Sequence, residues 1–498
     1  MNNDDNKPID KTIFTMAVLT VLLVSIPMML LSDTIGPLII NLYDHVAFNF
    51  GLVFQWVAIG CVGFMAWLAF GRYGNVKLGD GDPDFSTLSW VAMLFSAGVG
   101  GALLYWSVIE WAAYYTSPPF GAEARSPDAL RWATSYGMFH WGITAWCIYA
   151  LPTIAISYSF YVKKIPYLRL SAAILGEKSS TSLWAKVIDF SFMIALIGGA
   201  GTSLSLTAPM ISAGLSHLID IERGPTVDLV VICICITVFA TSVYLGLEKG
   251  IKKLADINFY LSIILLLFVL IAGPTTFILM MGTESIGFMM GNIIEMLTWT
   301  DAAENTGFVQ DYTIFYWAWW LAFAPYTGIF VTRISKGRTI KQVILCMCTY
   351  GSLGCWAFYI VLGNFALSVE LSGALPVASL IEADAFDAIS VIFLQLPFGS
   401  FALGLFVIVT LIYVATTYDS ASYTLASAAT KELHAGENPA TWHRIFWAFA
   451  LGILPIILMY IGGLKVVQSA VLLAGFPIAV ASIFMIHRLL KWLKEDHS

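Results

Sequence analysis

Charged residues are scarce in this chain. Only 11% of its 498 residues are Asp, Glu, Lys or Arg, whereas soluble globular proteins contain about 25%. Lys and Arg are missing altogether between residues 254 and 332 and between 342 and 430. Hydrophobic residues make up 59% of the chain, and the mean hydropathy is +0.81. The composition therefore excludes an ordinary soluble protein, and no segment reads as a soluble domain.

Motifs that hold metals or nucleotides are also absent. The sequence contains no CxxC, HExxH or P-loop pattern. Cys233 and Cys235 are two residues apart, so on a helix they point to opposite sides and cannot form a metal clamp. The net charge of −7 is spread over the loops and gives no indication of a nucleic-acid partner. We therefore expect no catalytic residues and no cofactor, which disfavours an enzyme. A receptor is disfavoured because no signalling domain is present.

Long apolar stretches dominate what remains. Segments of about 20 apolar residues, enough to cross a bilayer as a helix, recur from Thr12 to Leu490. They predict an all-α polytopic membrane protein with about twelve transmembrane helices. We expect these spans to begin near residues 12, 50, 88, 136, 184, 228, 255, 311, 341, 396, 443 and 466.

The distribution of Lys and Arg predicts the orientation, because basic residues gather in cytoplasmic loops. With the N-terminus inside, all basic residues fall in inner segments except Arg125, Arg131, Arg223 and Lys465. An even number of spans then puts both termini in the cytoplasm. The first span is too long for a signal peptide and is expected to be retained.

Two spans contain residues that interrupt helices. The third has Gly98, Gly100 and Gly101 in mid-span, which favours unwound backbone. The eighth carries Pro325 and Gly328. These spans are five apart, and broken helices at matching positions of two halves indicate a transporter site at a repeat interface. Glycines that allow close helix packing are the alternative explanation.

Tryptophan is concentrated in the eighth span, at Trp317, Trp319 and Trp320. Aromatic faces attract cations, and quaternary ammonium groups suit such cages well. An interfacial tryptophan belt is the alternative. Trp141, Trp146 and Tyr149 of the fourth span do not share one helix face. They could close a cage only together with the eighth span.

A few polar residues lie within apolar spans. Glu110 ends the third span and is expected near the outer surface, where snorkelling is about as plausible as contact with a substrate. His140 fits a structural role better than proton transfer. Thr416 and Thr417 precede Asp419 in the tenth span. Their oxygens suit a small hard cation, unless the hydroxyls bond the preceding helical turn.

Several motifs resemble the betaine/carnitine/choline transporter family. They are the segment 316–320 continuing into 329–340, the segment 139–142 followed by Trp146 and Tyr149, and the Gly-rich block 246–250. The resemblance covers nearly the whole chain. It implies two N-terminal helices followed by two inverted five-helix repeats of the LeuT type. It also implies import of a quaternary or methylated ammonium compound, assembly as a homotrimer, and a place in the bacterial cytoplasmic (inner) membrane, in contact with the lipid bilayer.

The same resemblance divides the chain and assigns its site. It implies N-terminal helices in 1–87, a first repeat in 88–283, an outer amphipathic helix and loop in 284–310, and a second repeat in 311–490. The substrate would be bound by Trp141, Trp146, Tyr149, Trp319, Trp320 and Phe323, with Trp317 at the entrance. The sequence does not rank betaine, carnitine and choline as substrates.

The driving ion is the least determined feature. Sodium-coupled members have a glycine-rich third span and hydroxyls in the tenth, which implies a sodium site at Ser96, Val99, Val414, Thr416 and Thr417. Coupling would further involve Gly98, Gly100, Asn258, Thr327 and Asp419. Asn258 and Thr327 replace the arginine and methionine of sodium-independent antiporters, which favours a symporter with one sodium site.

Other positions leave the antiporter alternative open. Leu196 and Ala200 stand where betaine symporters have threonines of a second sodium site. The segment 117–121 and Glu110 resemble the carnitine branch of the family. A sodium-independent exchange of substrate for product, as in carnitine/butyrobetaine antiporters, is therefore the second hypothesis. The short segments outside the first and last spans make osmotic regulation a weaker expectation.

Overall fold

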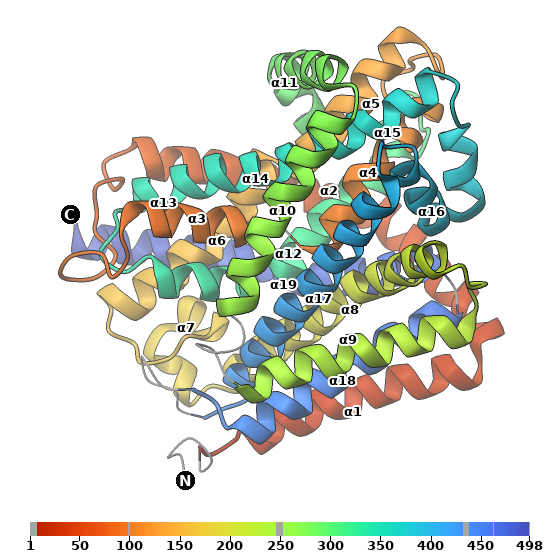
Figure 1. Ribbon diagram of the computed structural model, residues 1–498. Coiled ribbons are helices and arrows are strands. Elements are labelled where there is room, and N and C mark those ends of the chain that lie inside the picture. The colour runs from red at the N-terminus through yellow and green to blue at the C-terminus, as the bar shows by residue number, and fades with distance from the viewer. Residues whose placement is uncertain (1–6, 98–99, 246–251, 432–437, 462, 498) are drawn as a thin grey trace.

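The computed structural model describes residues 7–97, 100–245, 252–431, 438–461 and 463–497. These residues form one bundle of helices joined by loops (Figure 1). Ten helical segments among them are long and apolar enough to cross a membrane. The prediction of an all-α polytopic membrane protein is confirmed. The block 246–250 and residues Gly98 and Val99, on which predictions were made, lie outside the described residues.

The first three spans follow the predicted order. They are α1 (Lys11–Leu30), α2 (Ser32–Phe70) and the pair α3 (Thr87–Ala97) and α4 (Gly101–Thr116). Gly100 precedes α4 with extended backbone, at φ −141° and ψ 171°. The third span is therefore two helices rather than one, and its predicted interruption is confirmed.

The fourth span is also interrupted, which the sequence reasoning missed. It consists of α5 (Pro127–His140), α6 (Ile143–Ser157) and a π-helical turn, η2 (Tyr158–Val162). Trp141 and Gly142 separate the two α-helices, with Gly142 at ψ −147°. A side chain at position 142 would meet the carbonyl of Met138 at 2.6 Å, so the break requires glycine.

The eighth span corrects a prediction. It comprises a π-helical turn, η5 (Val309–Ile314), and α12 (Phe315–Ile334), and α12 continues through Pro325 and Gly328. The expected break there is wrong. A Cβ on Gly328 would lie 3.0 Å from the backbone nitrogen of Thr153, so this glycine serves close packing of α12 on α6. We expected breaks in the third and eighth spans, whereas the structure has them in the third and fourth.

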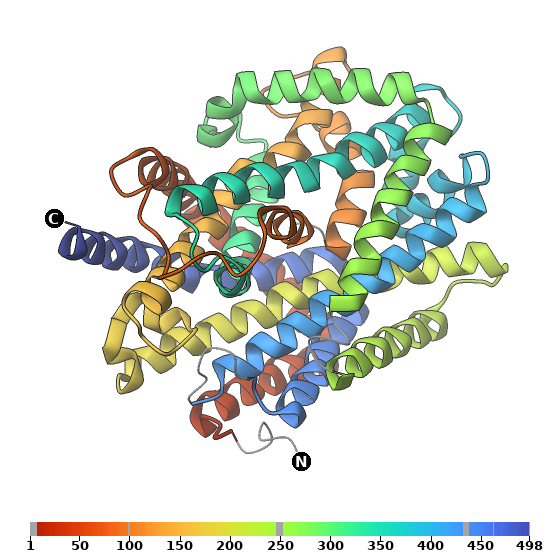
Figure 2. The ribbon, with the colours of Figure 1, turned by 60° about the vertical axis from the view of Figure 1, so that its left-hand side comes forward.

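The middle of the chain contains a helix that does not run with its neighbours. After α7 (Leu170–Leu175) and η3 (Gly176–Ser180), the long α8 (Leu183–Ile219) leads to α9 (Pro225–Leu245) and α10 (Lys252–Ala272). The next helix, α11 (Thr275–Thr298), lies crosswise to α10 and packs mainly on α5 (Figures 1 and 2). The amphipathic helix predicted from residue 284 therefore begins nine residues earlier, at Thr275.

In the last third of the chain, the ninth span alternates α-helices and π-helical turns, and regular helices follow it. The ninth span contains α13 (Ile340–Cys346), η6 (Met347–Gly351), α14 (Ser352–Phe358), η7 (Tyr359–Gly363) and α15 (Asn364–Leu371). A kinked helix, α16 (Val377–Leu394), follows between the ninth and tenth spans. The chain ends with α17 (Gly399–Ala428), α18 (Thr441–Ile461) and α19 (Gly463–Asp496).

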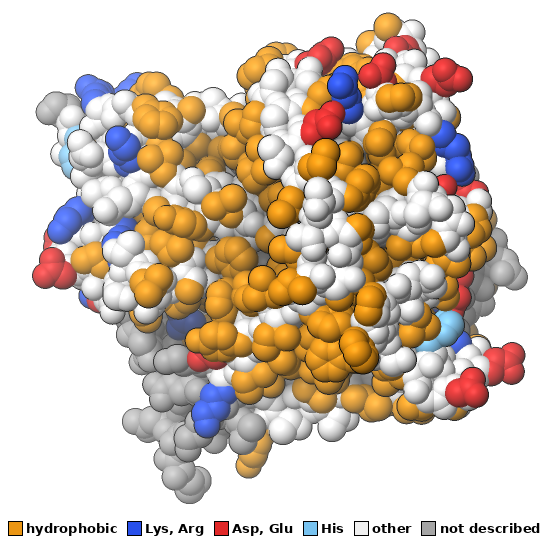
Figure 3. Space-filling view, turned by 45° about the horizontal axis from the view of Figure 1, so that its top comes forward, with side chains coloured by type: hydrophobic (Ala, Val, Ile, Leu, Met, Phe, Trp, Pro, Cys, Tyr) orange, Lys and Arg blue, Asp and Glu red, His pale blue; other side chains and the backbone are white. Residues whose placement is uncertain are grey.

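Ion pairs between segments that are distant in the sequence fall into two groups. Predicted inner segments pair with one another, through Lys163–Asp496, Lys164–Asp80, Lys336–Asp84 and Lys186–Asp10. Predicted outer segments do the same, through Arg125–Glu370, Arg131–Glu284, Arg223–Asp384 and His217–Asp387. Figure 3 shows a broad face of hydrophobic side chains, with charged side chains mostly at its margins. This arrangement fits an apolar belt between two polar surfaces.

Candidate functional site

A buried aromatic group lies where the break in the fourth span meets α12. Trp141 occupies the break itself, Trp146 and Tyr149 follow on α6, and Trp319 and Trp320 lie on α12. All five side chains are buried. The helices α6 and α12 are in extensive contact, partly because Gly328 lets their backbones approach. The structure therefore brings together the residues predicted from the two spans, although their role in binding stays a prediction.

The rings of this group meet mostly edge to face. Trp141 stands against Trp320 with centroids 4.6 Å apart at 74°, and against Trp319 at 5.9 Å and 81°. Tyr149 meets Trp320 at 5.9 Å and 79°, and Trp146 meets Tyr149 at 5.5 Å and 89°. Trp319 and Trp320 are nearly parallel, at 9° and 5.2 Å. We call these five residues the aromatic box.

The break in the fourth span also supplies hydrogen-bond acceptors. In a continuous helix the carbonyls of Met138 and His140 would accept from backbone N–H groups four residues on. Here Trp320 Nε1 donates to the His140 carbonyl at 2.8 Å, and Trp356 Nε1 donates to the Met138 carbonyl at 2.8 Å. Indole N–H groups thus satisfy carbonyls that the break leaves open, and they fix the orientation of Trp320.

Glycines on neighbouring helices accommodate the large rings. A Cβ on Gly351 would lie closer than 3.0 Å to the indole of Trp146. Phe323 packs on Gly199 of α8 in the same way, and its ring is 6.5 Å from Trp319. Phe323 is only half-buried and lies at the edge of the box. Small residues on α8 and in η6 therefore leave the space that these rings occupy.

Trp317 points elsewhere. Its ring is fully buried and meets Phe139 at 5.5 Å and His140 at 5.7 Å. It forms no ring contact with members of the box among the described residues. Its role at a substrate entrance stays a prediction.

The box has the chemistry to hold an organic cation. A cation within about 6 Å of a ring centroid is attracted by roughly 0.5–2 kcal/mol per face. The box offers no formal charge of its own, so several ring faces would have to replace the hydration of the cation. Trp141 and Trp320 touch in this structure, at 4.6 Å between centroids. A trimethylammonium group between these two rings would therefore require them to separate.

A buried acid lies one ring away from the box, and this corrects a prediction. Glu110 is not near the surface, because its side chain is 0% exposed. Both carboxylate oxygens accept hydroxyl hydrogen bonds, one from Tyr114 and one from Tyr359. His140 Nδ1 lies 3.6 Å from the Glu110 carboxylate. Tyr359 in turn meets Trp141 of the box, at 6.3 Å between centroids.

Only part of this group could be predicted from the sequence. Glu110 and His140 stood out as ionisable residues in apolar spans, but their pairing requires the packing of α4 on α5. Tyr114 stands one helical turn after Glu110, so its contact could have been read from the spacing. Tyr359 belongs to the ninth span, about 250 residues from Glu110. No spacing rule predicts that the two side chains are in contact.

The predicted sodium residues are brought near the break in the third span. A Cβ on Gly100 would lie 3.9 Å from Thr417 Oγ1, and one on Gly101 would lie 3.5 Å from Val414. Thr416 Oγ1 donates to the Tyr413 carbonyl at 3.1 Å, as expected for a hydroxyl satisfied by its own helix. Val99 and the side chain of Ser96 lie outside what the structure describes. The sodium assignment therefore stays a prediction.

The three other residues predicted to act in coupling lie in different places. Asn258 of α10 faces the α17 backbone, and the amide orientation that satisfies both of its atoms donates to the Val409 carbonyl at 3.2 Å. Thr327 is buried on α12. Asp419 faces away from Thr417, because it accepts a hydrogen bond from Ser242 of α9 at 2.5 Å and lies 3.8 Å from Arg444 of α18. Asp419 thus has an ion-pair partner in the interior, and its role in coupling stays a prediction.

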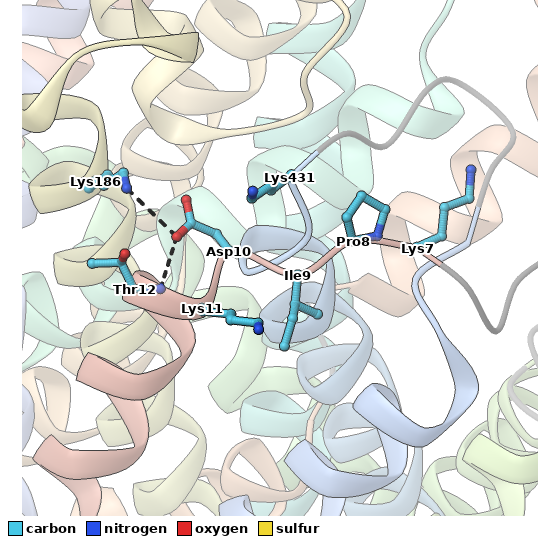
Figure 4. A pocket seen from close by; sticks show the side chains of 8 residues that line it. All are labelled: Lys7, Pro8, Ile9, Asp10, Lys11, Thr12, Lys186 and Lys431. Atoms are coloured by element: carbon cyan, nitrogen blue, oxygen red, sulfur yellow. Dashed lines mark hydrogen bonds and ion pairs between the residues drawn. The ribbon is translucent and has the colours of Figure 1, made fainter.

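A cavity at the N-terminal end of the bundle has different chemistry. It measures about 480 Å³ and is lined by Lys7, Pro8, Ile9, Asp10, Lys11, Thr12, Lys186 and Lys431 (Figure 4). Asp10 caps α1 through its bond to the Thr12 N–H and lies 3.8 Å from Lys186. Four lysines around one carboxylate do not suit a cationic ligand. The aromatic box is therefore the stronger candidate for binding a cation.

Comparison with known proteins agrees with the motifs. Residues 12–498 match the sequence profile of betaine/carnitine/choline family transporters (BCCT). An uncharacterized transporter of Escherichia coli (strain K12), YeaV, is 34% identical over 442 residues, which is 88% of this chain and 92% of YeaV. A carnitine transporter of Acinetobacter baumannii is 33% identical over 452 residues, which is 90% of this chain and 82% of the relative.

Proposed function

Because the chain belongs to the betaine/carnitine/choline transporter family, we propose that it imports a quaternary or methylated ammonium compound by sodium-coupled alternating access. The aromatic box carries this proposal. Five buried rings from the break in the fourth span, α6 and α12 meet at one site, and their faces can attract a methylated cation. The match confirms the family that the sequence motifs predicted. Members of this family are transporters, which excludes an enzymatic role.

The substrate would bind between Trp141 and the parallel faces of Trp319 and Trp320. Carnitine is a strong candidate because a relative that is 33% identical is a carnitine transporter. Betaine and choline carry the same trimethylammonium group and would use the same rings. A difference of one methyl group in such a pocket is worth only about 1–3 kcal/mol, so these compounds must be compared directly.

Uptake by the purified protein in liposomes tests the substrate. We expect Trp320→Leu to abolish uptake of the preferred compound, because it removes the ring that contacts both Trp141 and Tyr149. Trp56→Leu is the matched control, since Trp56 is 63% exposed and lies on α2, away from the box. If Trp320→Leu transports carnitine, betaine and choline as well as the wild type does, the box is not the substrate site.

Sodium coupling is supported by the approach of Thr417 to the break in the third span. The hydroxyl of Thr417 has no hydrogen-bond partner among the described residues, whereas that of Thr416 bonds the Tyr413 carbonyl. Hydroxyl and carbonyl oxygens suit a small hard cation. We propose that Thr417 supplies a ligand, together with Ser96, Val99, Val414 and Thr416.

The two threonines provide a sharp test of coupling. Replacing external sodium by potassium should slow uptake by the wild type. Thr417→Val should remove this sodium dependence, while Thr416→Val should weaken it less, because its hydroxyl is already engaged. Uptake that is equally fast in sodium and in potassium would refute the coupling while leaving the substrate assignment intact.

Substrate exchange without an ion is the second candidate. Leu196 and Ala200 are buried and apolar, so a second sodium site on α8 has no side-chain oxygen at these positions. An exchanger should be accelerated by substrate trapped inside the liposome, in the absence of sodium. Counterflow measured in potassium buffer distinguishes it from the symporter.

Placement and assembly complete the proposal. We propose that this multi-pass protein lies in the bacterial cytoplasmic membrane with both termini inside, which is supported by the ion pairs that predicted inner segments form with one another. We further propose a homotrimer. Cysteine accessibility from the periplasm tests the orientation, and light scattering in detergent tests the assembly.

A further inference from the structure

The buried Glu110 group joins the irregular parts of several spans. Glu110 lies on α4, the second helix of the broken third span, and His140 is the last residue of α5 before the break in the fourth. Thr313 lies in the π-helical turn η5, and Tyr359 begins the π-helical turn η7. Such turns are frequent at functional sites. An acid and a histidine buried in a membrane protein are costly and call for a function.

The hydrogen bonds around Glu110 fit an ionised carboxylate. Tyr114 and Tyr359 direct their hydroxyls at different oxygens of Glu110. An ionised carboxylate only accepts, so each tyrosine must donate its single proton to it. The oxygen of Tyr114 is then free to accept from His140 Nδ1, which lies 3.1 Å away. His140 therefore carries its first proton on Nδ1.

The other nitrogen of His140 can exist in two protonation states without losing its partner. His140 Nε2 lies 3.1 Å from Thr313 Oγ1. A threonine hydroxyl can donate to a neutral ring nitrogen, or it can rotate and accept from a protonated one. One proton can thus bind at Nε2 while every hydrogen bond of the network is kept. Its arrival changes the charge of the Glu110–His140 pair from −1 to 0.

We propose that Glu110 and His140 form a proton-binding site, and that its proton competes with the cationic group of the substrate. The site lies one aromatic layer from the box, because the ring of Tyr316 stacks on His140 at 4.6 Å and on Trp320 at 5.6 Å. A second positive charge near one buried carboxylate is disfavoured. Binding of the substrate cation therefore expels the proton from His140 Nε2 to the solvent.

Other groups around the pair do not account for such a proton. The titratable side chains that face it are Tyr114 on α4, Tyr136 on α5, Tyr312 in η5, Tyr316 on α12 and Tyr359 in η7. Tyrosine ordinarily titrates near pH 10, outside the range in which histidine acts. Within the described part of the chain, His140 is the only cationic partner that forms an ion pair with Glu110.

Calorimetry of substrate binding tests the proposal, which rests on the proposed function for its ligand. Purified full-length protein is titrated with carnitine, glycine betaine or choline at constant saturating sodium, in buffers of different ionisation enthalpy. We expect the wild type to release up to one proton per bound cation at some pH between about 5.5 and 8.5. Its apparent affinity should fall up to tenfold per pH unit below the midpoint of the site.

Variants assign the proton to this site. His140→Gln should bind without releasing a proton. His217→Gln should release it as the wild type does, because His217 pairs with the half-exposed Asp387 away from the box. Should His140→Gln fail to fold, Thr313→Val decides. It removes the acceptor of protonated His140 and should lower the midpoint by about one pH unit, whereas Thr313→Ser should leave it unchanged.

The outcomes separate this proposal from the function on which it rests. Binding by the wild type without proton release at any pH in this range overturns the proton site and leaves the transport function standing. Undiminished release by His140→Gln, or an unmoved midpoint in Thr313→Val, overturns the assignment to His140. Failure of the wild type to bind any of the three compounds overturns both.

Discussion

The parallel pair Trp319 and Trp320 allows one contribution to the site to be isolated. The two indoles are nearly parallel, at 9°, and stack on each other in the box. Trp320 Nε1 donates to the His140 carbonyl at 2.8 Å, whereas Trp319 Nε1 is buried without a hydrogen-bond partner among the described residues. Replacing each by phenylalanine removes a similar ring area, but only Trp320→Phe removes a hydrogen bond.

The expected difference follows from the break in the fourth span. Because the helix is interrupted at Gly142, no backbone N–H is in place to donate a hydrogen bond to the His140 carbonyl when the indole is removed. An unsatisfied buried carbonyl of this kind costs about 1–2 kcal/mol, which is roughly a 5- to 30-fold change in an equilibrium constant. We therefore expect Trp320→Phe to be less stable than Trp319→Phe by this amount.

Thermal unfolding in detergent measures the difference, with carnitine uptake as a second readout. Trp319→Phe should unfold within a few degrees of the wild type and keep most of its uptake. Trp320→Phe should unfold earlier and transport more slowly than Trp319→Phe. Equal losses in the two variants, or a larger loss in Trp319→Phe, would refute the idea that the indole at position 320 holds the broken span in place.

Three further substitutions, one of them with a control, test two glycine contacts around the site and the separate Asp419–Arg444 ion pair. Gly137→Ala should lower the unfolding temperature by an amount equivalent to about 1–3 kcal/mol and slow uptake, because the new methyl group would meet the ring of Tyr359 and push it from Glu110. Gly287→Ala is its control, since nothing lies within 4 Å of that position. Gly351→Ala should weaken carnitine binding, measured by calorimetry, because it displaces Trp146. Asp419→Asn should destabilise the fold by about 3–5 kcal/mol in thermal unfolding, because it removes the charge of a buried carboxylate that lies 3.8 Å from Arg444. An unchanged unfolding temperature in Gly137→Ala or Asp419→Asn, or unchanged binding in Gly351→Ala, would contradict these assignments.

Composition and the length of the apolar stretches predicted the membrane helices well, because hydrocarbon demands long apolar segments with internal hydrogen bonds. The break after Ala97 was also predictable, since three glycines within four positions cannot hold a helix alone. Pro325 and Gly328 looked similar in the sequence but lie within a continuous helix. Whether a glycine unwinds a span or admits a neighbour depends on what packs against it, which the local sequence does not contain.

The arrangement of the site likewise depends on packing that the local sequence does not contain. The concentration of indole at 317–320 was visible from the start, yet Trp317 points toward Phe139 and His140 while its neighbours form the box. The break at Trp141 and Gly142 carried only one glycine and no proline, so it left no strong signal. Glu110 seemed close to the surface because it ends an apolar stretch. Its burial results from helices far away in the sequence.

The continuity of α12 determines how a change at the box can reach the rest of the molecule. This helix of 20 residues is a rod about 30 Å long. It carries Trp319 and Trp320 in its first half, and at its far end Arg333 donates to the hydroxyl of Tyr423 on α17 at 2.7 Å. Because α12 stays helical through Pro325 between these points, we expect parting of the rings also to tilt or shift Arg333. A spectroscopic label beside the Arg333–Tyr423 contact would therefore report the opening of the box from the opposite end of the helix.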